Sequence, residues 1–260
     1  MQVSFKNICI AVSIFFTLIL FIAISSLFVV PKPHDVIMAL RTPEMVYSLK
    51  LSVLTALMAT TCAISMAIPI GYALSKGSFR GKGIVKSIVD LPMAFPELVL
   101  GLALLLLFGN TAIGKIIEAM GIRIVFTKAG VVVAQFFTGL PYAVRILCST
   151  FNSINPRYEL VSRSLGYGEF ETFKNVTLPL AKNGIFAATI ITFARCIGAF
   201  GAVLILAGGS YMKTEILPIT LYLNISYGNI GMAISSGIVL ILISFLAIAT
   251  FEWLERGNVY

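Results

Sequence analysis

The sequence is poor in charged residues and rich in apolar ones. Of its 260 residues, 12% are charged and 58% are hydrophobic, and the mean hydropathy is +0.99. Soluble domains carry roughly 25% charged residues, so this composition excludes a soluble globular protein. The apolar runs are long and continuous rather than alternating, which argues against a β-barrel. The sequence therefore predicts an all-α polytopic membrane protein.

Histidine and paired cysteines are also scarce. The chain has one histidine, His34, and four cysteines that all lie in apolar stretches and form no CxxC pair. A disulfide framework or a Cys/His metal site is therefore not expected. A Ser-His-Asp triad would depend on His34, which the predicted topology places in an external loop. We expect no metal site and no hydrolase.

The chain also lacks a nucleotide-binding motif. A P-loop reads G-x-x-x-x-G-K-[ST], whereas residues 77–83 read Gly-Ser-Phe-Arg-Gly-Lys-Gly, one residue short and without the final Ser or Thr. The run Gly166-Tyr167-Gly168 has Glu171 where a dinucleotide fingerprint has its third glycine. We therefore expect this chain to bind no cofactor.

Six apolar segments are predicted as transmembrane helices: 8–30, 46–75, 84–108, 128–152, 180–207 and 230–252. The first is longer than the apolar part of a signal peptide and is interpreted as a retained helix. Prolines interrupt three spans and free backbone carbonyls there: Pro69 in the second, Pro92 and Pro96 in the third, and Pro141 in the fourth. One membrane domain fills residues 1–260. Six helices make a thin wall for a polar route, so self-association is expected.

The basic residues indicate the orientation in the membrane. Eleven Lys and Arg fall on the side of both termini and seven on the opposite side, with Arg195 inside the fifth span. Positive residues favour the cytoplasm, so both termini are predicted to be cytoplasmic in a multi-pass protein of the cell membrane. Because the charges sort by loop, the net charge of +8 does not indicate nucleic-acid binding.

A polar island at residues 155–179 separates the fourth and fifth spans on the predicted cytoplasmic side. It opens with Asn155-Pro156, typical of an N-cap followed by the first helical residue. It closes at Gly166 and Gly168, which favour a helix end. The enclosed helix has only about three turns, too short to cross a bilayer.

The two faces of this short helix differ. Val161 and Leu165 are four residues apart on an apolar face, and Glu159 and Arg163 are spaced for an ion pair. Such a helix could lie on the lipid surface or dock on a partner protein, and the pattern alone favours neither.

The island resembles the EAA loop found in membrane subunits of binding-protein-dependent ABC importers. Glu159-Leu160-Val161 stands where that loop has E-A-A, Gly166 supplies its glycine, and Leu178-Pro179 closes it. Leu and Val replace the two usual alanines, while the spacing is intact. The resemblance implies a coupling helix that contacts the ATPase through Glu159, Leu160, Val161, Arg163, Ser164, Leu165, Gly166, Leu178 and Pro179.

Three further segments resemble the molybdate/tungstate permease family: residues 91–101, 194–209 and 214–222. Together with the island they extend the resemblance over residues 46–252, the permease core. Relatives often carry Glu where this chain has Ala199, so no role of that carboxylate transfers. Sulfate permeases share much of the same pattern.

The resemblance implies a six-helix transmembrane domain of the type I ABC importer class. It also implies a complex: a second copy of this chain, two cytoplasmic ATPase subunits that bind ATP and Mg²⁺, an external oxyanion-binding protein and the surrounding lipid bilayer. The implied function is the passage of molybdate or tungstate. One alternative is a permease for sulfate or another oxyanion. Another is a stand-alone secondary transporter or channel, although the chain shows no convincing inverted repeat.

Two charges, Glu97 and Arg195, lie near the middle of their apolar spans, and such residues usually pair or face a cavity. We predict that Glu97 and Arg195 pair between the third and fifth helices, or that Arg195 faces the pathway; a static bridge without a transport role is the alternative. Small residues on the fifth helix could form a gate or simply allow close packing. The pathway and gate candidates are Pro92, Pro96, Glu97, Arg195, Gly198 and Gly201.

Overall fold

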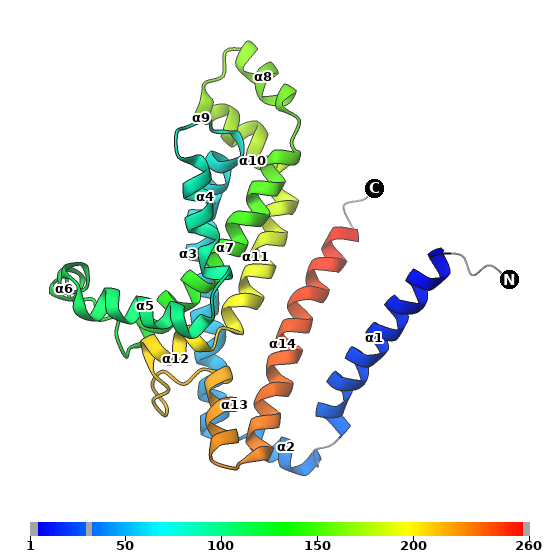
Figure 1. Cartoon of the computed structure of the whole chain (residues 1–260), viewed down its shortest axis with the longest axis vertical. Helices are drawn as coiled ribbons and strands as arrows, with labels where there is room; N and C mark the ends of the chain where they lie inside the picture. The colour runs from blue at the N-terminus through cyan, green and yellow to red at the C-terminus, as the bar shows by residue number, and fades with distance from the viewer. Residues whose placement is uncertain (1–4, 30–32, 257–260) are drawn as a thin grey trace.

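The structure is a computed structural model that describes residues 5–29 and 33–256, and these residues form helices joined by short turns (Figure 1). In chain order the elements are α1 (Phe5–Val29), α2 (Pro33–Leu40), α3 (Pro43–Lys76), α4 (Lys82–Asp90), η1 (Leu91–Met93), α5 (Glu97–Asn110), α6 (Ala112–Ala119), α7 (Lys128–Ser153), α8 (Pro156–Ser164), α9 (Glu169–Thr172), η2 (Phe173–Thr177), α10 (Leu178–Leu180), α11 (Lys182–Ile197), α12 (Gly201–Ala207), α13 (Leu217–Ser226) and α14 (Ile230–Arg256).

Four helices of the described chain are long and apolar enough to cross a bilayer: α1, α3, α7 and α14. Two bent pairs raise the number to six when each pair counts as one span. The predicted first, second, fourth and sixth spans are thus confirmed. The helices α3 and α7 continue through Pro69 and Pro141. The prediction that these two prolines interrupt their spans is therefore wrong.

The third predicted span, 84–108, is not one straight helix. The segment Lys82–Met93 and the helix α5 meet at an angle of 112°. Pro92 lies in the single 3₁₀ turn η1, and Pro96 occupies the N-cap position of α5. Proline removes a backbone donor and clashes with the preceding turn. Two prolines four residues apart therefore break the helix instead of only kinking it.

The fifth predicted span, 180–207, is also broken. The helix α11 ends at Ile197, a turn covers residues 198–200, and the short helix α12 begins at Gly201. At its other end, α11 is bent by 70° relative to the segment Glu169–Leu180. The longest straight helix in this span is therefore Lys182–Ile197.

The centre of the bundle is formed by α3, α7 and α11, which pack through small residues. On α3, Ala56, Ala59, Ala63 and Ala67 are completely buried. On α7, a β-carbon added to Gly139 would lie 2.6 Å from the Cys196 sulfur of α11. Because alanine and glycine have little or no side chain, the helices can approach closely, as in other membrane bundles.

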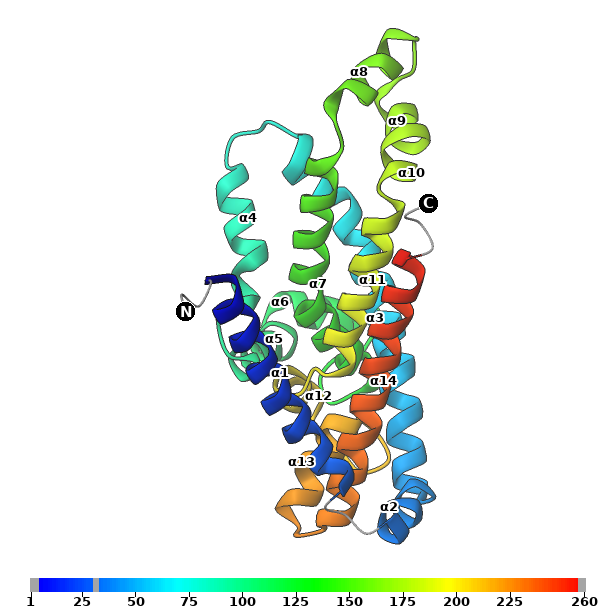
Figure 2. The same cartoon turned by 90° about the vertical axis from the view of Figure 1, so that its right-hand side faces the viewer.

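The arrangement places the polar island at one end of the molecule. In Figures 1 and 2, α8 and α9 project beyond the bundle at the top, while α2 and α13 lie at the bottom. The helices α5 and α6 extend sideways in Figure 1, and α1 and α14 lie on the opposite flank. Both α1 and α14 have their outer chain ends directed toward the α8 end. The first residues of α1 and the last residues of α14 therefore lie toward the same side of the bundle as the island.

Candidate functional site

The caps of α8 follow the sequence closely. The Asn155 side chain accepts a hydrogen bond from the backbone nitrogen of Arg157 at 3.0 Å, and Pro156 is the first helical residue. After the helix, Gly166 has φ of +91°, the left-handed conformation that glycine adopts without strain. The predicted start and end of this short helix are both confirmed.

The predicted ion pair between Glu159 and Arg163 is wrong. The Glu159 carboxylate is buried and accepts a hydrogen bond from the Thr177 hydroxyl at 2.8 Å. Arg163 instead pairs with Glu169 at 3.0 Å. Both partners lie on the chain that returns from the island to the membrane, so spacing within the helix could not reveal them. Glu159 therefore fastens α8 to the segment that ends in Leu178-Pro179.

A second hydrogen bond that fixes α8 lies one turn further along the helix. The hydroxyls of Ser162 and Thr172 are 2.9 Å apart and buried. Ser164, in contrast, donates only to the carbonyl of Leu160 in its own helix. Leu178 and exposed Pro179 belong to the short helix α10, directly after Thr177. The coupling candidates thus form two groups. Some fix the island to the rest of the chain, and the others are exposed on its surface.

The presented surface is apolar. Leu160, Val161, Leu165 and Phe170 are between 59% and 75% exposed. Beneath them, a cavity of about 1010 Å³ separates the island from the end of α3, with Tyr72, Lys76 and Arg163 in its wall. A rigid helix with a projecting apolar surface can insert into a groove on another protein.

The second candidate region is the contact between α5 and α12. One oxygen of Glu97 accepts hydrogen bonds from the backbone nitrogens of Phe200, at 3.1 Å, and Gly201, at 3.0 Å. Arg195 has a different partner, so the predicted pair of Glu97 and Arg195 does not form. Both helices break at this level, and the break exposes backbone N–H groups that a carboxylate can satisfy.

Arg195 is exposed and is held by Tyr142 of α7. Its guanidinium donates to the Tyr142 hydroxyl and its central carbon lies 4.3 Å from the centre of the ring. This geometry combines a hydrogen bond with a cation–π contact. Tyr142 was not a predicted site residue, and its position directly after Pro141 in α7 was the one sequence signal near it. That Arg195 faces the pathway stays a prediction.

The other gate candidates gather where α5 crosses α12. A β-carbon on Gly201 would lie 3.0 Å from Glu97 Cβ, and one on Gly101 would lie 2.9 Å from the Ala202 backbone. Gly198 is the C-cap of α11, while Pro92 and Pro96 flank the break before α5. The structure therefore brings Pro96, Glu97 and Gly201 together, with Gly198 and Arg195 at the adjacent end of α11.

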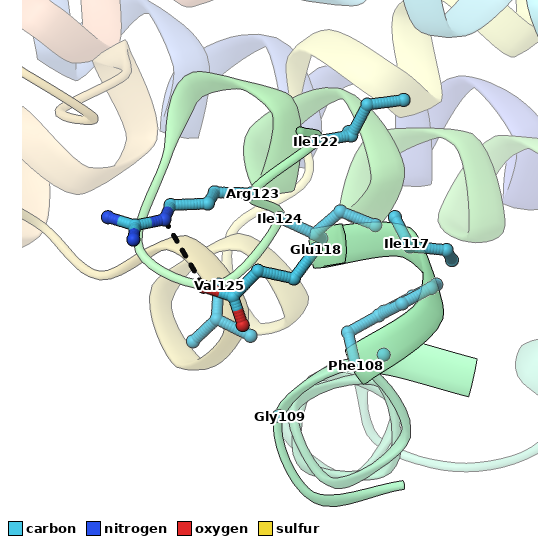
Figure 3. A pocket seen from close by; sticks show the side chains of 9 residues that line it. Phe108, Gly109, Ile117, Glu118, Ile122, Arg123, Ile124 and Val125 are labelled. Carbon is cyan, nitrogen blue, oxygen red and sulfur yellow. Dashed lines mark ion pairs between the residues drawn. The ribbon is translucent and has the colours of Figure 1, made fainter. Parts of the chain in front are cut away.

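A further pocket lies beside α6 and is shown in Figure 3. It has a volume of about 340 Å³, and its wall includes Phe108, Ile117 and Val125. The two charged residues at the pocket, Glu118 and Arg123, are paired with each other at 3.2 Å (Figure 3). Neither of them offers a free charge to a ligand.

Within residues 5–29 and 33–256, no group of three or more His, Cys, Asp and Glu could hold a metal ion. The described chain instead offers an exposed docking helix, broken helices and a pair of crossing short helices. A polytopic membrane protein with these features belongs to the transport class.

The chain belongs to the family of binding-protein-dependent transport system inner membrane components, which matches residues 63–259. It is 35% identical over 253 residues to the molybdate/tungstate transport system permease protein WtpB of Methanocaldococcus jannaschii, covering 96% of this chain and 98% of the relative. It is 36% identical over 192 residues to a probable molybdenum ABC transporter permease of Haloferax volcanii, covering 74% and 68%. A sulfate transport system permease protein, CysT of Salmonella typhimurium, is 28% identical over 214 residues, covering 82% and 77%.

Solved structures show the same fold. A bacterial ABC transporter that imports alginate matches with a TM-score of 0.76 at 14% identity, over 98% of this chain and 96% of the other. The MetNI methionine ABC transporter, in inward-facing conformations, matches with a TM-score of 0.61 at 18% identity, over 84% of this chain and all of the other. The fold is therefore that of the transmembrane part of an ABC importer of type I.

Proposed function

We propose that this chain is the permease subunit of an ATP-driven importer for molybdate or tungstate. Two copies would form the pathway in the cell membrane, with both termini in the cytoplasm. Two cytoplasmic ATPase subunits would bind ATP and Mg²⁺, and an external binding protein would deliver the oxyanion. This chain would bind no cofactor and carry out no hydrolysis itself. Permease relatives that are 35% and 36% identical and named for molybdate/tungstate or molybdenum transport support the substrate.

The observation that carries the proposal is the surface of α8. Its apolar side chains project from a helix that is fixed by the Glu159–Thr177 and Ser162–Thr172 contacts. In both views α8 lies beyond the outer ends of α1 and α14 (Figures 1 and 2). A helix resting on the lipid surface would lie level with those ends. The geometry therefore favours docking into a groove on the ATPase, through which ATPase motion would reach the membrane helices.

Docking can be tested by a pull-down of the ATPase with the full-length chain in detergent. Leu165→Asp should remove most of the ATPase from the complex, because a charge would be buried in an apolar contact. Tyr227→Asp is the matched control, since Tyr227 is equally exposed but lies beyond α13 at the opposite end. Undiminished capture by Leu165→Asp would contradict the assignment.

The substrate requires uptake by the reconstituted complex of permease, ATPase and binding protein. We expect radiolabelled molybdate uptake that tungstate inhibits strongly and sulfate weakly. Strong competition by sulfate would favour the sulfate permease alternative, which the CysT relative at 28% identity keeps open. Uptake that continues without the ATPase would instead indicate a secondary transporter or channel.

A further inference from the structure

Arg145 lies inside the membrane-spanning helix α7. It stands eight residues before the end of α7 at Ser153, about 12 Å along the helix axis. Its side chain is exposed in the single chain. Among the described residues it has no hydrogen bond, ion pair or ring contact. A cation at this depth usually faces water or a partner.

The residues around Arg145 form a polar stripe on α7. At 100° per residue, Tyr142, Arg145, Ser149 and Ser153 fall within an arc of about 80°. Tyr142 holds Arg195 of α11, one turn closer to the opposite end of the molecule. Two exposed arginines on neighbouring helices therefore stand about one turn apart, with hydroxyls leading from them toward the α8 end.

The stripe lines an open groove of about 480 Å³ on the surface of α7. Its wall consists of Arg145, Ile146, Ser149, Thr150 and Ser153 and contains no carboxylate. Thr150 and Ser153 donate their hydroxyl protons to the carbonyls of Ile146 and Thr150, at 2.9 and 2.8 Å. Arg145 and Ser149 are thus the two lining residues with donors left for a ligand.

These donors suit an anionic ligand that offers several oxygen acceptors. A guanidinium binds tetrahedral oxyanions through two parallel hydrogen bonds, and a neighbouring hydroxyl can donate a third. We propose that Arg145 and Ser149 form a binding site for a tetrahedral oxyanion, called the station below. It would lie in the half of the pathway nearer to α8, so that an imported ion reaches it after passing Arg195. The inference rests on the proposed function, because it takes the transported oxyanion as the ligand. A lipid phosphate has the same chemistry and is the competing source.

Transport provides the first test. In the reconstituted complex, Arg145→Gln should lower ATP-driven molybdate uptake by about tenfold or more, the loss expected for one hydrogen bond to a charged group. Arg145→Lys should recover part of the rate because it restores the charge. Arg80→Gln removes an exposed arginine from the loop between α3 and α4 and should leave uptake unchanged. Uptake by Arg145→Gln at the wild-type rate would overturn the station.

Thiol labelling separates the transported ion from a lipid. In the full complex, with the four native cysteines replaced, Ser149→Cys should react several times faster with an anionic than with a cationic methanethiosulfonate, as expected beside an unpaired cation. Millimolar molybdate should slow the anionic reaction, and Arg145→Gln should remove the charge preference. Reaction only with a hydrophobic maleimide would mean that the stripe faces lipid, and the proposal would be wrong.

Different results would contradict the proposed function and the station formed by Arg145 and Ser149. If the wild-type complex takes up neither molybdate nor tungstate, the proposed function fails. If the wild-type complex transports molybdate but neither Arg145→Gln uptake nor Ser149→Cys labelling responds as expected, only the station fails. Equal labelling rates for anionic and cationic reagents would indicate that Arg145 is neutralised by a carboxylate of the second copy, which also overturns the station.

Discussion

The carboxylate of Glu97 lies 3.0 Å from the backbone nitrogen of Gly201, more than a hundred residues away along the chain. The same oxygen accepts from Phe200, so one side chain at the start of α5 satisfies two N–H groups at the start of α12. Both helices begin directly after a break. Glu97 therefore joins the two broken spans at the point where they cross.

Replacing Glu97 by Gln should loosen this crossing. The amide has no charge, so the two hydrogen bonds lose their charge-assisted character. We expect a loss of roughly 1–3 kcal/mol in unfolding free energy, the range for a partly buried hydrogen bond to a charged group. Thermal unfolding of the purified chain in detergent would measure it. Glu118→Gln is the control, because the exposed Glu118–Arg123 pair should contribute less than about 1 kcal/mol.

The sequence predicts the spans better than it predicts their breaks. Continuous apolar runs and helix caps act locally, so the ends of α7 and α8 lie within a residue or two of the prediction. A proline inside an apolar run is ambiguous, because Pro69 and Pro141 leave their helices continuous while Pro92 and Pro96 accompany a 112° bend. The difference depends on neighbouring helices that satisfy the freed carbonyls, and periodicity contains no information about them.

The contact between Tyr142 and Arg195 should matter for transport more than for folding. Tyr142→Phe keeps the ring and removes the hydroxyl, whereas Tyr142→Ala removes both contacts. A cation–π contact contributes about 0.5–2 kcal/mol. We therefore expect a mild loss of molybdate uptake for Phe and a larger one for Ala, with similar amounts of assembled complex. Uptake at the wild-type rate by both variants would show that Arg195 does not need Tyr142.

Close helix packing can be tested at two glycines. Gly139→Ala should be destabilising by about 1–3 kcal/mol, because the new carbon would lie 2.6 Å from the Cys196 sulfur in a filled core. Gly83→Ala, in an exposed turn of α4 with nothing within 4 Å, should be neutral or stabilising by up to about 1 kcal/mol. Unfolding in detergent would show whether the two variants differ in sign.

Side-chain partners across the fold were the least predictable part of the site. The spacing of Glu159 and Arg163 favours an ion pair within α8, yet each finds its partner on the returning chain. Burial of Glu159 explains this choice, because a buried carboxylate requires a donor nearby, and Thr177 supplies it at lower cost than a desolvated arginine. The motif contained one hint, since Thr177 directly precedes Leu178-Pro179.

Thr177→Val should therefore uncouple the island without changing its exposed surface. Removing the hydroxyl leaves the Glu159 carboxylate buried without its donor, at a cost of about 1–3 kcal/mol. We expect the ATPase to remain bound in a pull-down while molybdate uptake per ATP hydrolysed falls. The neighbouring change Val176→Thr adds a hydroxyl nearby and serves as the control. Normal coupling in Thr177→Val would show that this tether does not transmit motion.

Glu215, in the turn before α13, gives the described chain a pH dependence. Its carboxyl is 2% exposed and one oxygen has no hydrogen-bond partner. Burial raises the pKa of Glu215 above its usual range, and the nearby Glu44 carboxylate raises it further. Glu44 is itself oriented by Asn224, which donates to it at 2.9 Å. The folded chain therefore retains a proton at Glu215 that the unfolded chain has already released.

Stability should consequently fall as the pH rises from the ordinary glutamate pKa, about 4.3, through the raised value in the folded state. Below this window both states are protonated and the contribution of Glu215 is constant. Glu215→Gln keeps the shape and cannot ionise, so its melting temperature should exceed that of the wild type at pH 8 and approach it at pH 4. Glu118→Gln should show no such difference. Parallel pH profiles for the wild type and Glu215→Gln would mean that this carboxyl titrates alike in both states.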